Sequence, residues 1–206
     1  MLETTALACE RGGLRLFSDL GFALGGGGLL RVRGSNGSGK TTLLRTLAGL
    51  TRPASGAVRW HGSDIGELGE RYRSEMLFLG HAPAVKDEFS VIENLDFSAR
   101  LAGLNTDKNK SKEALEQLGI VRLANLPASH LSQGQRRRAA LARLALSTAV
   151  PLWLLDEPFA ALDDEAIGRV SGLCASHLAA GGLLVLTSHQ DVAITAPAVQ
   201  TIALQG

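Results

Sequence analysis

Hydrophobic and polar positions follow two different periods along this chain. Four short segments are apolar enough to predict strands of a sheet: 29–33, 76–79, 152–155 and 183–186. The last two are continuous apolar runs, which are typical of parallel strands covered on both faces. Two longer segments, 41–50 and 134–147, instead place apolar residues at helical spacing. The alternation of strands and helices predicts an α/β architecture.

The remaining patterned segments add strands near the start of the chain and helices in its middle. Residues 4–24 read as short strands broken by a turn at 11–13, and 57–60 as another strand. The pattern then becomes helical, over 91–95 and again over 112–118. The strand-rich beginning is therefore followed by a helical segment.

Composition limits the classes of protein that need to be considered. The chain has 206 residues, 45% of them hydrophobic, and a formal net charge of +1, which fits one folded domain and no polybasic surface. Cys9 and Cys174 lie far apart without metal-site spacing, so we expect buried thiols in a reducing cytosol. We expect no signal peptide, and no window approaches the ~18 apolar residues that span a bilayer.

A glycine-rich segment precedes the first predicted helix and has the form G-x4-G-K-T. Gly34, Gly37 and Gly39 allow backbone amides to turn around phosphate oxygens. Lys40 can reach the β- and γ-phosphates of a nucleotide, and the Thr41 hydroxyl can bind Mg²⁺. The residues that we expect to bind ATP here are Gly34, Ser35, Asn36, Gly37, Ser38, Gly39, Lys40, Thr41 and Thr42.

Two acidic residues, Asp156 and Glu157, directly follow the apolar run 152–155. Asp156 can hold Mg²⁺ through water, and Glu157 would then be placed to polarise a water that attacks the nucleotide. The alternative is an acidic strand end that only caps the following turn. The phosphate-binding segment upstream favours the catalytic interpretation.

The segment Leu131-Ser132-Gln133-Gly134-Gln135 stands at the start of a predicted helix. Ser132 is suited to cap that helix, and the positive helix end with its free amides could bind a γ-phosphate. The two interpretations are compatible. Three arginines follow at 136–138, and we interpret them as a solvated helix face rather than a nucleic-acid surface, because aromatics and a wider basic bias are lacking.

The order of these three motifs resembles the ATP-binding-cassette (ABC) ATPases. The resemblance implies one P-loop ABC domain over 1–206, with a mixed sheet core, a small antiparallel β part and a helical subdomain. The core would comprise about 1–80 and 136–206, and the helical subdomain about 81–135. It also implies a head-to-tail homodimer formed on ATP binding, in which Ser132, Gly134 and Gln135 complete the partner's site.

The resemblance assigns roles to three further places. Residues 161–163 resemble the family's loop that contacts the other protomer, and His189 resembles the switch histidine that bonds the γ-phosphate and orients the catalytic glutamate. His81 stands where the family usually has a glutamine that contacts Mg²⁺ and the attacking water, so we expect His81 to serve there. Arg11 stands where an aromatic ring usually stacks on adenine, and a guanidinium plane could replace that ring.

Several details resemble one subfamily, the ATP-binding subunits of bacterial cytochrome c maturation complexes, which are described as haem exporters. The details are the sequences at 80–83, 131–138, 155–159 and 187–190. The resemblance implies an integral membrane permease subunit of a haem-handling complex as partner, and a peripheral location at the cytoplasmic face of the bacterial inner membrane. We expect no nucleic-acid partner and, without a C-x-x-C-H motif, no direct haem binding.

Three alternatives remain open from the sequence. The chain could drive an ABC transporter for another small substrate, since nothing in the motifs names the cargo. A soluble ABC mechanoprotein is less favoured, because such proteins usually carry two cassettes or long insertions. A module that binds nucleotide without hydrolysing it is disfavoured by the presence of Asp156, Glu157 and His189.

Overall fold

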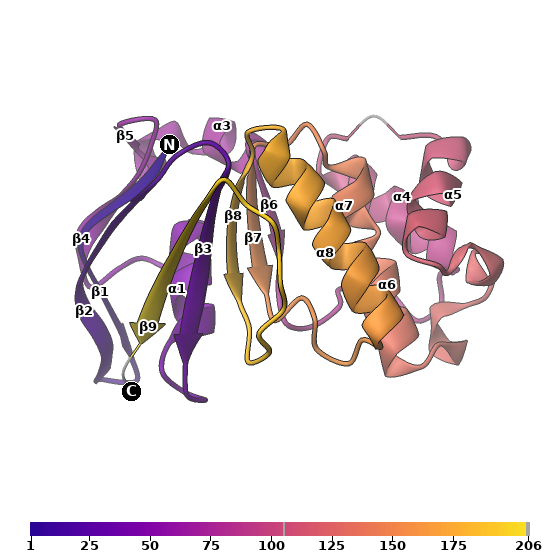
Figure 1. The fold of residues 1–206 in the computed structure, drawn as a ribbon, viewed down its shortest axis with the longest axis horizontal. Coiled ribbons are helices and arrows are strands. Elements are labelled where there is room, and N and C mark those ends of the chain that lie inside the picture. The colour runs from indigo at the N-terminus through magenta and orange to yellow at the C-terminus, as the bar shows by residue number, and fades with distance from the viewer. Residues whose placement is uncertain (105, 205–206) are drawn as a thin grey trace.

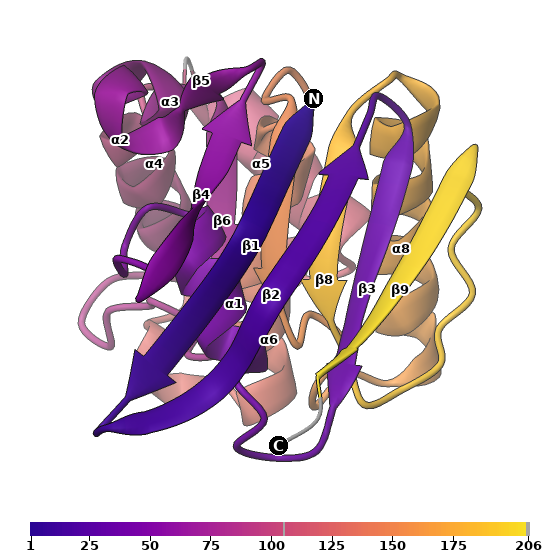
Figure 2. The same ribbon diagram turned by 90° about the vertical axis from the view of Figure 1, so that its left-hand side faces the viewer.

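Two sheets face each other with one helix between them (Figures 1 and 2). The computed structural model describes residues 1–104 and 106–204. The larger sheet is five-stranded and parallel throughout, in the order β6-β7-β8-β3-β9. Its strands are β3 (Gly28–Gly34), β6 (Met76–Leu79), β7 (Leu152–Asp156), β8 (Leu183–Thr187) and β9 (Ala198–Leu204).

Strand β7, which lies between β6 and β8, shows why the sheet is covered on both faces. Leu152 and Leu154 pack into the cluster around α1 (Lys40–Leu47), while Trp153 and Leu155 pack into the cluster on the opposite face. Side chains alternate between the faces of a strand, so a continuous apolar run fills both clusters at once.

The smaller sheet is antiparallel, in the order β2-β1-β4-β5, and covers α1 from outside (Figure 2). Its strands are β1 (Leu2–Arg11), β2 (Leu14–Leu24), β4 (Ser55–Trp60) and β5 (Ser63–Asp64). The expected short strands in 4–24 are in fact two long ones, because bulges absorb the irregular spacing without ending the pairing. The short helices α2 (Ile65–Leu68) and α3 (Glu70–Ser74) follow β5.

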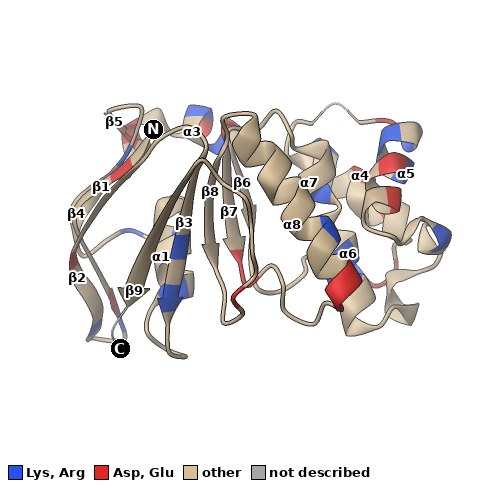
Figure 3. Cartoon of the chain, viewed as in Figure 1, with Lys and Arg blue, Asp and Glu red and all other residues tan. Residues whose placement is uncertain are grey.

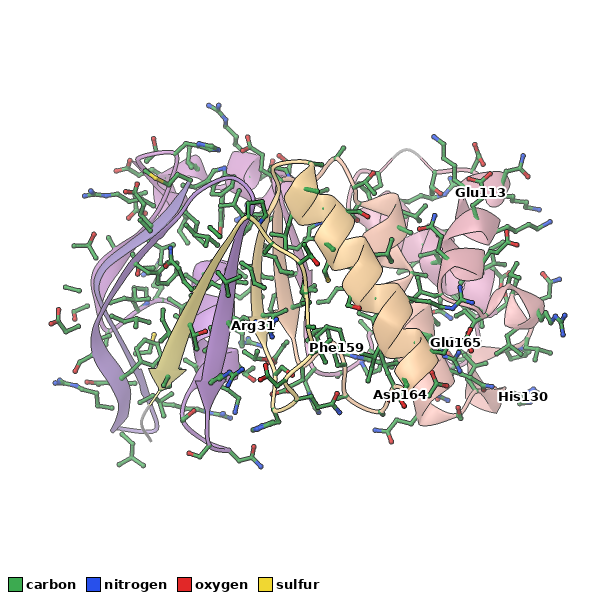
Figure 4. All side chains as sticks on the ribbon, in the orientation of Figure 1. Arg31, Glu113, His130, Phe159, Asp164 and Glu165 are labelled. Carbon is green, nitrogen blue, oxygen red and sulfur yellow. The ribbon has the colours of Figure 1, made fainter. Side chains whose placement is uncertain are left out.

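Helices cover the other face of the parallel sheet and extend beyond its β6 edge (Figure 1). The long helix α8 runs from Asp164 to Ala179 across that face, with Asp164 and Glu165 at its first turn (Figure 4). The others are α4 (Val91–Leu101), α5 (Lys108–Gln117), the 3-10 turns η1 (Val121–Leu123) and η2 (Ala128–His130), α6 (Gln133–Leu141) and α7 (Arg143–Leu146). The α/β prediction with a small antiparallel part is confirmed.

The expected single helix over 134–147 is wrong in one respect. It is interrupted at Ala142, so that α6 and α7 are separate helices. Within residues 1–104 and 106–204, no helix combines the length and the hydropathy that would allow it to cross a membrane.

Candidate nucleotide site

The loop between β3 and α1 has a backbone that demands glycine at two points. Gly39 caps α1 with φ of 97°, in the left-handed region, and a Cβ there would lie 3.0 Å from Leu16 Cβ. At Gly34, φ is 153° and a Cβ would lie 2.7 Å from the Leu204 carbonyl oxygen. The loop is therefore pressed against β2 and β9, which fixes its path into the helix.

Lys40 is folded back onto this loop. Its Nζ donates to the Gly34 carbonyl at 2.9 Å and to the Ser35 carbonyl at 3.1 Å, and it lies 3.2 Å from His189 Nε2. Only 8% of the residue is exposed. A buried ammonium group binds an anion more strongly than it binds neutral carbonyl oxygens. Lys40 is therefore well placed to leave the two carbonyls when an anion enters the site.

Asp156, at the end of β7, is fixed by two hydroxyls. Thr41 Oγ1 donates to Asp156 Oδ2 at 2.8 Å, and Thr187 Oγ1 donates to Asp156 Oδ1 at 2.7 Å. The carboxylate is almost fully buried, and these two hydroxyls hold one oxygen each. A hydroxyl beside a carboxylate offers the hard oxygen ligands that Mg²⁺ prefers, so these residues fit a magnesium ion that also binds phosphate.

Glu157 adopts a left-handed backbone conformation, with φ of 50°. Such a conformation is unfavourable for a residue with a Cβ and is found most often at functional sites. The carboxylate accepts from the His189 backbone N–H at 3.2 Å, and its Oε1 lies 3.4 Å from His189 Nε2. Glu157 and His189 therefore form a pair, although β7 and β8 deliver them from different parts of the chain.

A single cavity of about 440 Å³ joins most of the expected site residues. Those that line it are Arg11, Asn36, Gly37, Gly39, Lys40, Thr41, Thr42, His81, Asp156, Glu157 and His189. Gly34 and Ser35 contribute carbonyls that hold Lys40, and Ser38 is buried behind the loop, so these three lie outside the lining. The structure thus brings together residues from five separate segments of sequence.

His81 and Arg11 sit in this cavity although each departs from the family pattern. His81 lies in the loop after β6, and Arg11 lies at the end of β1, beside Leu16 in the lining. Phe17 and Phe22 are half-buried against the hydrophobic cluster around α1 and do not line the cavity. The side chain of Arg11 therefore lines the cavity, whereas the nearby phenyl rings of Phe17 and Phe22 do not.

Ser132, Gly134 and Gln135 do not line this cavity. Ser132 caps α6 in a reciprocal box: its Oγ accepts from Gln135 N at 3.3 Å, and Gln135 Oε1 accepts from Ser132 N at 2.9 Å. Gly134 faces the Ala161 carbonyl, which would lie 2.7 Å from a Cβ at that position. The start of α6 is thus capped by its own side chains and lies against the loop that follows Glu157.

The interpretation of the three arginines of α6 as a solvated helix face is wrong for Arg137. Arg137 is only 4% exposed and reaches inward, while Arg136 pairs with Asp87 and Arg138 lies 3.6 Å from Asp163. Fully buried arginines occur only where hydrogen bonds compensate for the lost water. The sequence showed a run of charges, but not the carbonyls that receive one of them.

Two residues that the sequence analysis does not single out, Thr187 and Arg31, hold the site together. Thr187 links Asp156 with the Glu157 backbone, whose N–H donates to Thr187 Oγ1 at 2.9 Å. Arg31, which projects from β3 (Figure 4), donates to the Val192 carbonyl at 2.7 Å and so anchors the segment that carries His189. Thr187 ends an apolar strand beside the strand that ends in Asp156, and this position could have predicted its place in the site. Nothing in the sequence around Arg31 indicates its role.

The comparisons with known proteins agree with this geometry. Residues 17–160 match the family model described as ABC transporter. A protein of Nitrosospira multiformis, named cytochrome c biogenesis ATP-binding export protein CcmA, is 48% identical over 203 residues, which cover 98% of each chain. A solved ATP-binding subunit of an ABC transporter has a TM-score of 0.78 at 25% identity, covering 92% of this chain and 80% of its own. A dimeric ATP-binding cassette in a post-hydrolysis state, bound to ADP and Pi, has a TM-score of 0.80 at 22% identity, covering 92% of this chain and 88% of its own.

Proposed function

Because the chain belongs to the ABC transporter family and is an ATP-binding, ATP-hydrolysing subunit, we propose that it drives a haem-handling membrane complex in cytochrome c biogenesis. The family resemblance drawn from the three motifs is confirmed. The name of the Nitrosospira relative supports the pathway, since the two chains match over nearly their full lengths. The convergence of Lys40, Glu157 and His189 on one cavity carries the ATPase part of the proposal, and the match to the Nitrosospira relative carries the pathway.

In the proposed reaction, ATP binds with its phosphates over the loop 34–39 and the start of α1. Lys40 leaves the two carbonyls that now hold it and moves to the β- and γ-phosphates. Thr41 and Asp156 would hold Mg²⁺, which when bound offsets the negative charge on the phosphate oxygens. Arg11 lies against the adenine and His81 against the γ-phosphate region.

Glu157 and His189 then act on the attacking water. The Glu157 carboxylate accepts a hydrogen bond from that water and directs it in line with the bond that breaks. His189 holds the carboxylate through its backbone N–H and presents its imidazole to the γ-phosphate. The Nζ of Lys40, which also binds the phosphates, already lies close to this imidazole. Arg31 keeps the His189 segment in place, because it binds the Val192 carbonyl three residues further on.

The same proposal explains why Ser132, Gly134 and Gln135 stand outside the cavity. In a head-to-tail dimer the start of α6 would cover the γ-phosphate of the partner, with the positive helix end towards the anion. The capping box between Ser132 and Gln135 holds that end ready for this contact. Hydrolysis would remove the contact, and the dimer would open.

The helical part, about 81–135, is the proposed transmitter to the permease, on the cytoplasmic face of the bacterial inner membrane. Phe97 and Leu101 of α4 are 40% and 73% exposed, which is unusual for large apolar side chains on one helix. They line a shallow groove with Val85 and Lys86, only a few residues beyond His81. A membrane subunit seated there would sense the state of the nucleotide cavity.

Charges of both signs are interspersed over the molecule in Figure 3, and we therefore propose no nucleic-acid partner. We also propose no direct haem binding, because the sequence has no C-x-x-C-H motif.

The deciding experiment is a pull-down from detergent-solubilised bacterial membranes with the Glu157→Gln protein and Mg-ATP, which holds the closed state. We expect haem-handling membrane subunits to co-purify, and a Phe97→Asp/Leu101→Asp protein to lose them while still binding ATP. Recovery of a different permease would keep the ATPase and reject the haem role. Recovery of no membrane protein would reject the membrane role altogether.

A further inference from the structure

One buried guanidinium bridges the two catalytic loops of this chain. Arg137 Nη1 donates to the carbonyls of Gly80 and His81, at 3.0 and 3.1 Å. Its Nη2 donates to the carbonyls of Asp156 and Glu157, at 2.8 and 2.7 Å. The loop after β6 and the loop after β7 are therefore tied to the same planar group.

The chemistry of this contact favours a specific role over simple packing. A buried cation that meets only neutral carbonyls is costly, and burial lowers the pKa of Arg137 while the nearby carboxylates of Asp156 and Glu157 oppose that shift. The Arg137 Nε atom is buried and has no hydrogen-bond partner among residues 1–104 and 106–204. A lysine, with one nitrogen instead of a rigid fork, could not serve both loops from the same place.

The position of Arg137 in α6 connects this clamp with the other end of the helix. It lies two residues after Gln135, and α6 begins at the capping box that Ser132 and Gln135 form. Gly134 also rests on the Ala161 carbonyl, in the loop that follows Glu157. The start of α6 and the contacts of Arg137 with the loops of His81 and Glu157 are thus less than two helical turns apart.

We propose that Arg137 is a positioning residue that couples the two ATP sites of the dimer. The start of α6 senses the partner's γ-phosphate, and Arg137 passes that contact to the loops that carry His81 and Glu157 of its own site. Each site is then fully ordered only when the other holds ATP. This inference rests on the proposed function, because it needs two sites that act together.

The test compares Arg137→Gln with the wild type in two assays. ATP affinity is measured on the full chain with a fluorescent ATP analogue, and steady-state hydrolysis is measured over a range of ATP concentrations on the complex with its membrane partner. We expect the affinity for ATP to stay within about threefold, because Arg137 does not line the cavity. We expect kcat to fall about 10- to 100-fold, as for other residues that orient catalytic groups, and the Hill coefficient to fall towards about 1.

Two further variants separate positioning from stability. Arg136→Lys is the matched control: it keeps its pairing with Asp87 at the surface, and its kcat should stay within about twofold. Arg137→Lys keeps the charge but not the fork, so its kcat and Hill coefficient should remain well below those of the wild type. A purely structural role would lower the melting temperature and leave kcat and the Hill coefficient of the folded protein unchanged.

The outcomes keep this inference apart from the proposed function. A wild-type complex without ATP hydrolysis would reject the proposed function itself. A cooperative wild type together with an equally active and cooperative Arg137→Gln or Arg137→Lys protein would reject only the clamp. If neither variant folds, hydrogen exchange on the wild type decides: Mg-ATP should protect residues 79–82 and 133–137 together, and protection of only one segment would overturn the coupling.

Discussion

Thr187 and Asp156 are joined across the neighbouring strands β8 and β7, where Thr187 Oγ1 donates to Asp156 Oδ1 at 2.7 Å. The same hydroxyl accepts the backbone N–H of Glu157 at 2.9 Å. Since Thr41 holds the other oxygen of Asp156, the carboxylate is fixed on both sides. One buried hydroxyl therefore orients both acidic residues at the end of β7.

Replacement of this hydroxyl should damage stability and turnover together. Thr187→Val keeps the shape but leaves the Glu157 N–H and Asp156 Oδ1 without their partner in a fully buried place. We expect the free energy of unfolding to fall by about 2–3 kcal/mol, measured by urea denaturation, and kcat to fall as well. Thr187→Ser, which retains the hydroxyl, should lose much less of either. A loss in Thr187→Ser as large as that in Thr187→Val would contradict the assignment of the effect to the hydroxyl.

The catalytic pair gives the most direct prediction on activity. Glu157→Gln keeps the side-chain size and the contact with the His189 backbone but removes the base, so turnover should fall by about 10²- to 10⁴-fold while ATP still binds. Phosphate release and nucleotide binding, measured in parallel, separate these effects. Lys40→Ala is the contrasting variant and should lose ATP binding itself, because it removes the cation that faces the phosphates. Near-normal turnover in Glu157→Gln would exclude Glu157 as the base.

The strands and motifs of this chain were predictable because their causes are local. The run 152–155 is apolar at every position because its side chains pack on both faces of the sheet. Residues 34–41 contain glycines because a loop that wraps its backbone around phosphate needs left-handed conformations. The fate of Arg137 was not predictable in this way. Its four carbonyl partners come from residues 19 to 57 positions away, so only the assembled sheet shows why a charge is buried there.

Two elements of the C-terminal third leave no clear pattern in the sequence. No prediction was made for α8 or β9, although β9 completes the sheet beside β3. Most of β9 is exposed, so its sequence lacks the continuous apolar run that marks β7 and β8. An edge strand is placed by its hydrogen bonds to a neighbour, which a pattern of hydrophobic positions does not record.

Two glycines in helices give a matched test of the contact between α6 and the loop after Glu157. Alanine normally stabilises a helix by about 1 kcal/mol relative to glycine, and Gly168 in α8 has open space around its Cβ position, so Gly168→Ala should stabilise by about that amount. At Gly134 the new Cβ would lie 2.7 Å from the Ala161 carbonyl. We expect Gly134→Ala to lower the melting temperature instead and to reduce hydrolysis. A gain in stability at both positions would show that the backbone at Ala161 can move away from the new methyl group at little energetic cost.

The buried histidine of α8 predicts a specific loss of stability in acid. His177 is stacked on Trp153 with ring centroids 3.9 Å apart, and its Nε2 lies 3.2 Å from the Leu183 carbonyl. Its Nδ1 is buried and has no hydrogen-bond partner in the described part of the chain. Burial lowers the pKa of His177, and the hydrogen bond to Leu183 only partly opposes this. The unfolded chain therefore takes up a proton near the ordinary histidine pKa of about 6.5, while the folded chain resists it, so the free energy of unfolding falls as the pH drops below that value. Urea denaturation at about pH 7.5 and about pH 5.5 should show a larger loss for the wild type than for His177→Phe, which keeps a ring on Trp153 but has no group to titrate. The difference between the two proteins isolates His177 from the carboxylates that titrate in both, and an identical loss in both would show that His177 is protonated equally in the folded and unfolded chains.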